Sequence, residues 1–432
     1  MIKATAHGAT DVGRKRDHNE DSFSIDEEVG VYIVCDGLGG HAAGEVASEI
    51  ACSTIQRVLS QNRKVLSSYA EDPTLYNRAR ATAIIEVAID TASREVFIAA
   101  QEDPTKKGMA TTLVMLVVMG ANAIAAHVGD SRLYLFRRDK TYQLTEDHTM
   151  LNEQVRRGQI SQEEAAKTKK TGIVTRTVGY FEAAEADTLH LELMPGDTYL
   201  LCSDGMCDYF AGGEFGEACR TAEHHEGSLP WLIQLANERG GKDNITGITV
   251  KIEGELAPEA TEADRKLDAL KKIPVFSNLS YQELMKVLNV ARLEAFSAGD
   301  QILTEGDDGD TMYVSVTGTF EVTKNGQHVA DLPTGSFFGD MALIDKAPRS
   351  ASIITKENAK LLAIERKSFF HLIKTEHALA AKLLWAFCQI INHRLRETTE
   401  ELSSARSNLS GESPALQEIR NIFEEEDDPD LP

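Results

Sequence analysis

The sequence predicts an α+β protein in two folded parts: a larger N-terminal unit of helix-covered sheets and a smaller β-barrel or jelly roll with flanking helices. Length is the first observation behind this prediction, because 432 residues exceed the about 100–200 residues of an ordinary domain. The second is the alternation of short β-branched runs with long helical stretches up to residue 253. The third is a series of short strands separated by glycine turns between residues 294 and 365.

Hydrophobic periodicity places the elements of the N-terminal unit. Apolar, β-branched runs predict strands, and these lie at 30–35, 112–118, 123–128 and 199–203. Helical periodicity predicts two long helices, at 44–59 and 82–100. Such a mixture indicates sheets covered by helices.

The C-terminal half begins with a change in composition. Acidic and small residues around Pro258 predict a linker. A helix is predicted at 280–290, where Ser280 and Glu283 form a capping-box pattern. Helical periodicity returns at 367–396, and the polar chain that follows ends in consecutive acidic residues and is predicted to be mostly disordered. The predicted division is 1–253 for the first domain, 254–265 for the linker, 266–396 for the second domain and 397–432 for the acidic tail.

Charge and cysteine content exclude several classes of protein. The net charge of −23 disfavours nucleic acid and anionic membranes as main partners, because both require a basic surface. The six cysteines form no Cys-x-x-Cys pair, which predicts reduced thiols and a cytoplasmic location. The polar start of the chain predicts no signal peptide, and the apolar run at 112–119 is too short to span a membrane.

Aspartates at the ends of predicted strands are the main chemical signal. Apolar runs end at Asp36-Gly37, Gly129-Asp130 and Asp204-Gly205, and a fourth aspartate, Asp243, precedes another strand-like run. Converging carboxylates require compensation, which the hard cations Mg²⁺ and Mn²⁺ supply through oxygen ligands. Any one of these aspartates alone is more simply explained as part of a turn. Four such aspartates in this order favour a metal site.

Six ordered motifs carry a family resemblance. They are Arg16…Asn19-Glu20-Asp21, Asp36-Gly37…Gly39-Gly40-His41, Gly108-Met109-Ala110-Thr111-Thr112, Gly129-Asp130-Ser131-Arg132, Ser203-Asp204-Gly205 and Asp243-Asn244. Over residues 5–252 the chain resembles the type 2C, metal-dependent protein phosphatases, and the bacterial-type branch most of all. The resemblance implies an αββα sandwich with helices on both outer faces and the metal ions at one end.

The resemblance also implies the roles of individual residues in a site for two or three Mn²⁺ or Mg²⁺ ions. The implied metal-site residues are Asp36, Gly37, Asp204, Asp243, Glu20, Asp21 and Asp130. Asp36 would bridge two ions, with Asp204 and Asp243 completing the site of the first. The Gly37 carbonyl would bind the second ion, near which Glu20 and Asp21 act partly through water. Asp130 matches a position linked to a third, weaker ion.

The chemistry implied by the family is hydrolysis of phosphoserine and phosphothreonine in proteins. A metal-bridging hydroxide would attack phosphorus directly, while Arg16 holds the substrate phosphate. A cognate serine/threonine kinase would supply the phosphorylated substrates. The general acid stays open between a metal-bound water and His41, because Leu38 occupies the position of the family's catalytic histidine. His127 and His148 are predicted to be core or turn residues.

A further expectation concerns residues 146–180. In the family this region forms a flap near the active site that influences substrate choice. The alternative is an ordinary amphipathic helix and turn.

A second constellation lies in the C-terminal domain. A glycine turn, a short helix and an arginine after proline predict a compact anion pocket. The segment resembles the phosphate-binding cassette of cyclic-nucleotide-binding domains, and the wider resemblance covers residues 266–396. The implied nucleotide-binding residues are Gly339, Asp340, Met341, Ala342, Arg349 and Ser350. Arg349 would hold the cyclic phosphate and Asp340 the ribose, although a glutamate is usual at the latter position. Ser350 is compatible with either cyclic AMP or cyclic GMP.

These patterns together predict a phosphatase whose activity is set by a cyclic nucleotide, with the linker and the tail as candidate transmitters. One alternative is a catalytically silent cyclic-nucleotide receptor or scaffold. Another is an active phosphatase whose second domain is a docking module that binds no nucleotide. Trp385 is predicted either to cap the bound base or to lie in the core.

Overall fold

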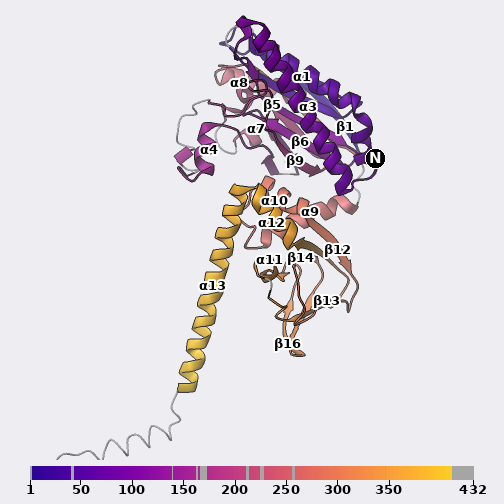
Figure 1. Ribbon diagram of the computed structural model, residues 1–432, viewed down its shortest axis with the longest axis vertical. Helices are drawn as coiled ribbons and strands as arrows, with labels where there is room; N and C mark the ends of the chain where they lie inside the picture. The colour runs from indigo at the N-terminus through magenta and orange to yellow at the C-terminus, as the bar shows by residue number, and fades with distance from the viewer. Residues whose placement is uncertain are drawn as a thin grey trace, which may run out of the picture.

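The computed structural model shows two joined parts, with a long C-terminal helix that leaves the smaller part (Figure 1). It describes residues 2–39, 43–138, 140–161, 164–165, 173–210, 214–223, 228–254, 258–345 and 347–410. The N-terminal part is a sandwich of two antiparallel sheets covered by helices, and the C-terminal part is a small all-antiparallel β unit with helices around it. The predicted fold class is therefore confirmed.

Two sheets form the middle layers of the N-terminal part. The first has the order β2 (Asp21–Asp26), β3 (Val31–Leu38), β5 (Leu113–Met119), β6 (Asn122–Val128) and β9 (Asp187–Glu192), with β4 (Ala110–Thr111) paired to β3. The second has the order β1 (Lys3–Asp11), β11 (Ile245–Glu253), β10 (Thr198–Cys202), β7 (Arg132–Arg137) and β8 (Lys140–Gln143). Apolar side chains such as Val34, Leu116, Leu133 and Leu201 fill the space between the sheets.

Helices cover both outer faces of this sandwich. The first sheet carries α1 (Ala43–Gln61), α2 (Arg63–Glu71) and α3 (Leu75–Glu102), which is followed by the 3₁₀ turn η1 (Pro104–Lys106). The second carries α6 (Asp204–Cys207), α7 (Glu214–Glu223) and α8 (Ser228–Glu238). Each outer layer buries its own apolar cluster against the sheet beneath it. A separate helix, α4 (Met150–Arg156), stands at one end of the sandwich (Figure 1).

The C-terminal part contains two four-stranded sheets and is a jelly-roll-like unit, not a closed barrel. One sheet has the order β12 (Ala291–Phe296), β19 (Ala359–Glu365), β14 (Thr311–Thr317) and β17 (Phe337–Phe338). The other has the order β13 (Gln301–Leu303), β18 (Ser352–Thr355), β15 (Phe320–Lys324) and β16 (Gln327–Leu332). The accompanying helices are α9 (Pro258–Lys272), α10 (Tyr281–Val290), α11 (Met341–Ile344), α12 (Arg366–Thr375) and α13 (His377–Ser410).

Two helices extend into segments for which the sequence predicts no helix. Helix α9 begins at Pro258, inside the predicted linker, because proline is well tolerated in the first turn of a helix. Helix α13 continues to Ser410, beyond the predicted start of the tail, since neither glycine nor proline interrupts residues 377–410. Residues 411–432 lie outside the described part. The domain boundaries themselves stay a prediction.

The predicted capping box at the start of α10 is confirmed. The Glu283 carboxylate accepts from the Ser280 backbone N–H at 2.8 Å, and the Ser280 hydroxyl accepts from the Glu283 N–H at 3.2 Å. Among the helices of the described residues, none is long and apolar enough to cross a membrane.

A polar and aromatic joint connects the two parts. The Tyr281 ring of α10 lies 4.1 Å from the ring of Tyr142 on β8, and its hydroxyl accepts from Arg137 at 3.2 Å. Arg137 is itself held by a buried, bidentate ion pair with Asp197, at 2.8 and 2.7 Å. Charge-assisted, bidentate bonds of this kind fix side-chain geometry. The first turn of α10 is therefore seated on strands β7 and β8.

Candidate functional site

The strand ends of the sandwich bring the predicted aspartates together. Strands β10 and β11 are antiparallel neighbours, with Cys202 opposite Gly247, so Asp204 after β10 and Asp243 before β11 lie at the same edge. Their approach requires a glycine, because a Cβ on Gly205 would lie 2.0 Å from the Asn244 carbonyl oxygen. The other sheet contributes Asp36 near the end of β3.

Asp21 links the two sheets at this end of the sandwich. It lies opposite Asp36 in the pairing of β2 with β3 and is only 8% exposed. One of its carboxylate oxygens accepts from the Ser203 hydroxyl at 2.8 Å. The other, Oδ1, is buried without a hydrogen-bond partner among the described residues. A buried carboxylate oxygen in this condition is a natural ligand for a cation.

Burial and mutual repulsion shape the electrostatics of this acidic cluster. Burial first, and then neighbouring carboxylates, raise the pKa of Asp36 well above its usual range. Those carboxylates are Asp21, Asp204, Asp130 and Asp243. Burial is also the main cause that raises the pKa of Asp21 to about 7 and that of Asp130 to about 7, and the charge of Asp204 adds to both. So many buried and half-buried carboxylates close together require either protons or cations, and an all-oxygen donor set fits Mn²⁺ or Mg²⁺.

Gly37 and Glu20 lie beside Asp36 at close backbone contacts. The Gly37 N–H donates to the Glu20 carbonyl oxygen at 3.1 Å. A Cβ on Gly37 would lie 2.2 Å from the Gly44 carbonyl oxygen, so only glycine fits. Burial is the largest cause that raises the pKa of Glu20. The N-terminal end of α1 therefore packs against both residues.

Arg16 borders the cluster on its exposed side. Its guanidinium donates to the Asp243 carboxylate at 2.8 Å and lies 3.9 Å from that of Glu20, while 47% of the side chain stays exposed. The structure thus places Arg16 and all seven predicted metal-site residues at one end of the sandwich. His41 and Gly40 lie outside the described residues.

Thr111 and Thr112, to which the family resemblance assigns no role, hold the backbone of Asp36. The Thr112 hydroxyl accepts from the Asp36 N–H at 3.0 Å, and the Thr111 hydroxyl donates to the Asp36 carbonyl at 2.8 Å. Thr112 also shares a 2.7 Å hydrogen bond with Ser131, next to Asp130. The sequence pattern that could have predicted this role is a pair of adjacent hydroxyl side chains at the start of an otherwise apolar run.

Asn244 is a second positioning residue whose role the sequence did not reveal. Its side-chain oxygen accepts from the Glu20 N–H at 2.9 Å. Its amide nitrogen donates to the carbonyls of Val12 and His18, each at 2.9 Å. The side chain therefore fixes the loop that carries Arg16. The sequence pattern that could have predicted this role is an amide side chain directly before a buried strand.

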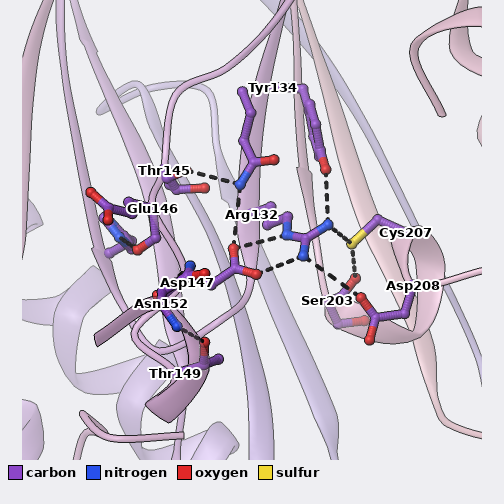
Figure 2. Close-up of polar contacts among 12 residues, drawn as sticks. Arg132, Tyr134, Thr145, Glu146, Asp147, Thr149, Asn152, Ser203, Cys207 and Asp208 are labelled. Atoms are coloured by element: carbon purple, nitrogen blue, oxygen red, sulfur yellow. Dashed lines mark hydrogen bonds and ion pairs between the residues drawn. The ribbon is translucent and has the colours of Figure 1, made fainter. Parts of the chain in front are cut away.

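An arginine beside the cluster anchors the first turn of the predicted flap (Figure 2). Arg132 makes a bidentate ion pair with Asp147, at 2.8 and 2.6 Å, and lies 3.7 Å from Asp208. The Asp147 carbonyl accepts from Asn152 in α4 at 2.9 Å. The start of the flap is thereby tied to strand β7, while residues 162–163 and 166–172 lie outside the described part.

His127 and His148 are buried core residues, as the sequence predicts. Their rings stack at 4.6 Å, and with Asp187 they bring three possible metal-ligand atoms within 4.8 Å of one another. His148 Nδ1, however, accepts from the Gly129 N–H at 3.1 Å, and Arg176 donates to Asp187 at 2.8 Å. Burial is the main cause that lowers the pKa of His127 to about 4. His127, His148 and Asp187 therefore form a hydrogen-bonded support for the predicted flap.

The second predicted site surrounds Arg349. Its guanidinium donates to the carbonyls of Thr311 at 2.8 Å and Gly339 at 3.5 Å. A Cβ on Gly309 would lie 2.1 Å from this guanidinium, and one on Gly339 2.7 Å, so the two glycines make room for it. Burial lowers the pKa of Arg349, yet the side chain stays ionised at neutral pH because an arginine pKa is intrinsically high.

The rest of the predicted cassette flanks Arg349. Asp340 directly precedes α11, Met341 and Ser350 are exposed, and Ala342 is buried. Trp385 on α13 is 67% exposed, so the expectation of a core role is wrong. Trp385 is exposed because it lies on the face of α13 opposite to the buried Leu383 and Phe387.

This site and fold define a metal-dependent phosphohydrolase joined to a ligand-binding domain. A family model for protein phosphatase 2C matches residues 12–244, and one for the cyclic nucleotide-binding domain matches residues 293–376. The chain belongs to the protein phosphatase 2C family. It is a protein serine/threonine phosphatase with Mn²⁺ or Mg²⁺ as its cofactor, and it carries a cyclic nucleotide-binding domain in its C-terminal half.

Several bacterial phosphatases are similar to the N-terminal part. The chain is 35% identical over 245 residues to the serine/threonine phosphatase stp of Listeria innocua, which covers 56% of this chain and 93% of the relative. It is 32% identical over 264 residues to protein phosphatase PhpP of Streptococcus pneumoniae, covering 57% and 97%.

Two solved structures support the same assignment. The serine/threonine phosphatase PstP/Ppp of Mycobacterium tuberculosis is 30% identical, covers 59% of this chain and 100% of its own, and gives a TM-score of 0.51. The S. agalactiae serine/threonine phosphatase is 32% identical, covers 58% and 100%, and gives 0.50.

Proposed function

We propose that this phosphatase acts through the acidic cluster around Asp36 and that a cyclic nucleotide bound at Arg349 regulates it. The observation that carries the catalytic part is the buried Oδ1 of Asp21, which has no hydrogen-bond partner within the described part of the chain, among carboxylates that raise one another's pKa. Asp36, Asp204 and Asp243 would hold two Mn²⁺ or Mg²⁺ ions, assisted by the Gly37 carbonyl, Glu20 and Asp21. Asp130 would serve a third ion.

When bound, these ions supply Lewis acidity toward water and toward the phosphate oxygens. The chain's own groups supply orientation. Thr111 and Thr112 hold the Asp36 backbone, so the carboxylate needs little rearrangement during the reaction. Arg16 is half exposed and oriented by Asp243, which leaves its guanidinium accessible to a substrate phosphate.

Regulation is supported by the route from the nucleotide-binding part to the active site. Tyr281 of α10 contacts Arg137 at the end of β7. Arg132, at the start of the same strand, anchors the flap through Asp147. A ligand that favours one position of α10 would therefore act on the wall of the active site, which is the differential contact that regulation requires.

The decisive experiment measures Mn²⁺-dependent hydrolysis of a phosphothreonine peptide with and without saturating cyclic AMP or cyclic GMP. One nucleotide is expected to change the rate, and Arg349→Ala should abolish that change. Tyr281→Phe removes only the hydroxyl that Arg137 contacts and should reduce the change while nucleotide binding persists. Binding without any effect on the rate would sink the regulatory proposal and favour a docking module.

The remaining expectations belong to the same proposal. Substrates would be phosphoproteins made by a cognate serine/threonine kinase, in the cytoplasm. None of the six cysteines, all of which lie among the described residues, forms a disulfide, in keeping with a reducing compartment. A catalytically silent receptor has no observation in its favour, because the carboxylates of the metal centre are all present.

A further inference from the structure

A cavity of about 840 Å³ adjoins the metal centre. Asp130 and Asp204 line it on the side of the acidic cluster. Arg132, Asp147 and Asn152, which Figure 2 shows in one hydrogen-bonded group, form an adjacent wall. A phosphoryl group alone would fill only a small part of this space, whose volume falls within the about 300–1,000 Å³ typical of ligand sites.

The opposite wall comes from the nucleotide-binding part of the chain. Helix α13 contributes Ala378, Ala381 and Lys382, and α10 contributes Ser280 and Glu283. The Lys382 ammonium lies 2.8 and 3.0 Å from the two Glu283 oxygens. Because Glu283 also closes the capping box with Ser280, this wall is internally braced. Because the side chains of Ala378 and Ala381 are small, the cavity beside this wall stays open.

We infer that this cavity holds the polypeptide segment that flanks the phosphoserine or phosphothreonine of the substrate, and that helices α10 and α13 form one side of the substrate site. This inference rests on the proposed metal centre. A peptide attached to a phosphoryl group at the acidic cluster has the cavity as its adjoining space. The second domain would then take part directly in substrate selection.

The chemistry of the walls matches such a segment. The charges are largely satisfied within each wall, since Asp147 and Asp208 face Arg132 and Glu283 faces Lys382. Amide and hydroxyl groups of Asn152 and Thr149 alternate with apolar groups such as Leu151 and Val155 of α4. Mixed polar and apolar surfaces of this kind suit a polypeptide better than a small anion.

The test fills the cavity from the second domain. Ala381→Trp places bulk in the cavity from an exposed position on α13, where a larger side chain should not disturb the core. The KM for a phosphothreonine peptide is expected to rise about tenfold, while kcat/KM for para-nitrophenyl phosphate changes less than about twofold. Ala378→Leu, a smaller addition to the same wall, should give an intermediate rise in KM.

The matched control is Gln389→Trp, which adds the same side chain at an exposed position of α13 outside the cavity. Its kinetics on both substrates should equal those of the wild type. Equal peptide KM values for Ala381→Trp and Gln389→Trp would overturn the inference, and so would equal losses on both substrates in Ala381→Trp. A failure of the metal centre itself would be distinguishable, because the wild type would then hydrolyse neither substrate.

Discussion

The proposed metal centre and the proposed nucleotide pocket are built in opposite ways. The proposed metal centre gathers residues from Arg16 to Asp243, which only the register of two packed sheets brings together, and its carboxylates are either buried, as that of Asp21 is, or half-buried. The pocket draws its cassette from residues 339–350, a short local segment that is mostly half exposed or exposed. A site built from distant residues depends on the fold of the whole domain and on the protonation of its carboxylates. A site built from one local segment should lose ligand affinity through single substitutions that leave the fold intact.

The largest expected effect in this comparison is that of Asp36→Asn. Even residues that only support metal ligands typically lower activity about 10–100-fold when replaced, so loss of a bridging carboxylate should abolish Mn²⁺-dependent hydrolysis of a phosphothreonine peptide. Cyclic-nucleotide binding should persist. Asp72→Asn, a substitution at the end of α2, is the control that should keep the full rate. A full rate in Asp36→Asn would refute the bridging role.

Arg349→Ala should weaken nucleotide binding and leave basal phosphatase activity unchanged. Loss of a charge-assisted hydrogen bond of about 1.5–3 kcal/mol corresponds to a Kd for cyclic AMP or cyclic GMP about 10–150-fold higher. Isothermal titration calorimetry measures this change, and basal phosphatase activity should stay at the wild-type level. Arg292→Ala removes an arginine that is 61% exposed and should leave Kd unchanged. Unaltered affinity in Arg349→Ala would contradict a phosphate contact.

Arg16→Ala tests the exposed edge of the metal centre and should have a smaller effect. The KM for a phosphopeptide is expected to rise about tenfold with a lesser change in kcat, as for loss of a substrate contact made before the chemical step. Arg63→Ala is a matched control, because Arg63 is 50% exposed and also forms an ion pair. An unchanged KM in Arg16→Ala would argue against contact with the substrate phosphate.

The smallest expected effect is the change with pH in the stability of the metal-free protein. Asp21 and Asp130 have an ordinary pKa of 3.8 and a pKa of about 7 in the folded chain. Between these values the folded chain binds more protons than the unfolded chain, so the stability of the metal-free protein should fall as pH rises through this window. Thermal unfolding in EDTA at about pH 5 and about pH 8 measures the change.

Asp130→Asn is the control for this pH dependence, because it removes one of the two shifted groups and should make the profile flatter. Mn²⁺ should raise Tm more at the higher pH, where protons no longer compete with the cation. A Tm of the metal-free protein that rises with pH between these values would contradict the raised pKa values.

The sequence predicted much of the acidic cluster because its residues follow recognisable strand ends. Asp36 and Asp204 each come directly after an apolar run, and the helix-capping signal at Ser280 was equally local. Residues that act through tertiary contacts were harder to predict. Asn244 bonds to a loop more than 220 positions away, and the bond between Arg132 and Asp147 depends on how the flap folds back. The exposure of Trp385 follows from its place on α13, on the face opposite to the buried Leu383 and Phe387.

The apolar core of the sandwich has a consequence for how the molecule unfolds. The cluster between the sheets, with Tyr199 and Leu201, is continuous with one in the C-terminal part that contains Leu270 and Phe276. Since the two parts share buried surface, heat should melt them in a single cooperative transition. Free energy contributed by a ligand in either part then protects both. The polypeptide contains two proposed functional sites but is expected to behave as one thermodynamic unit.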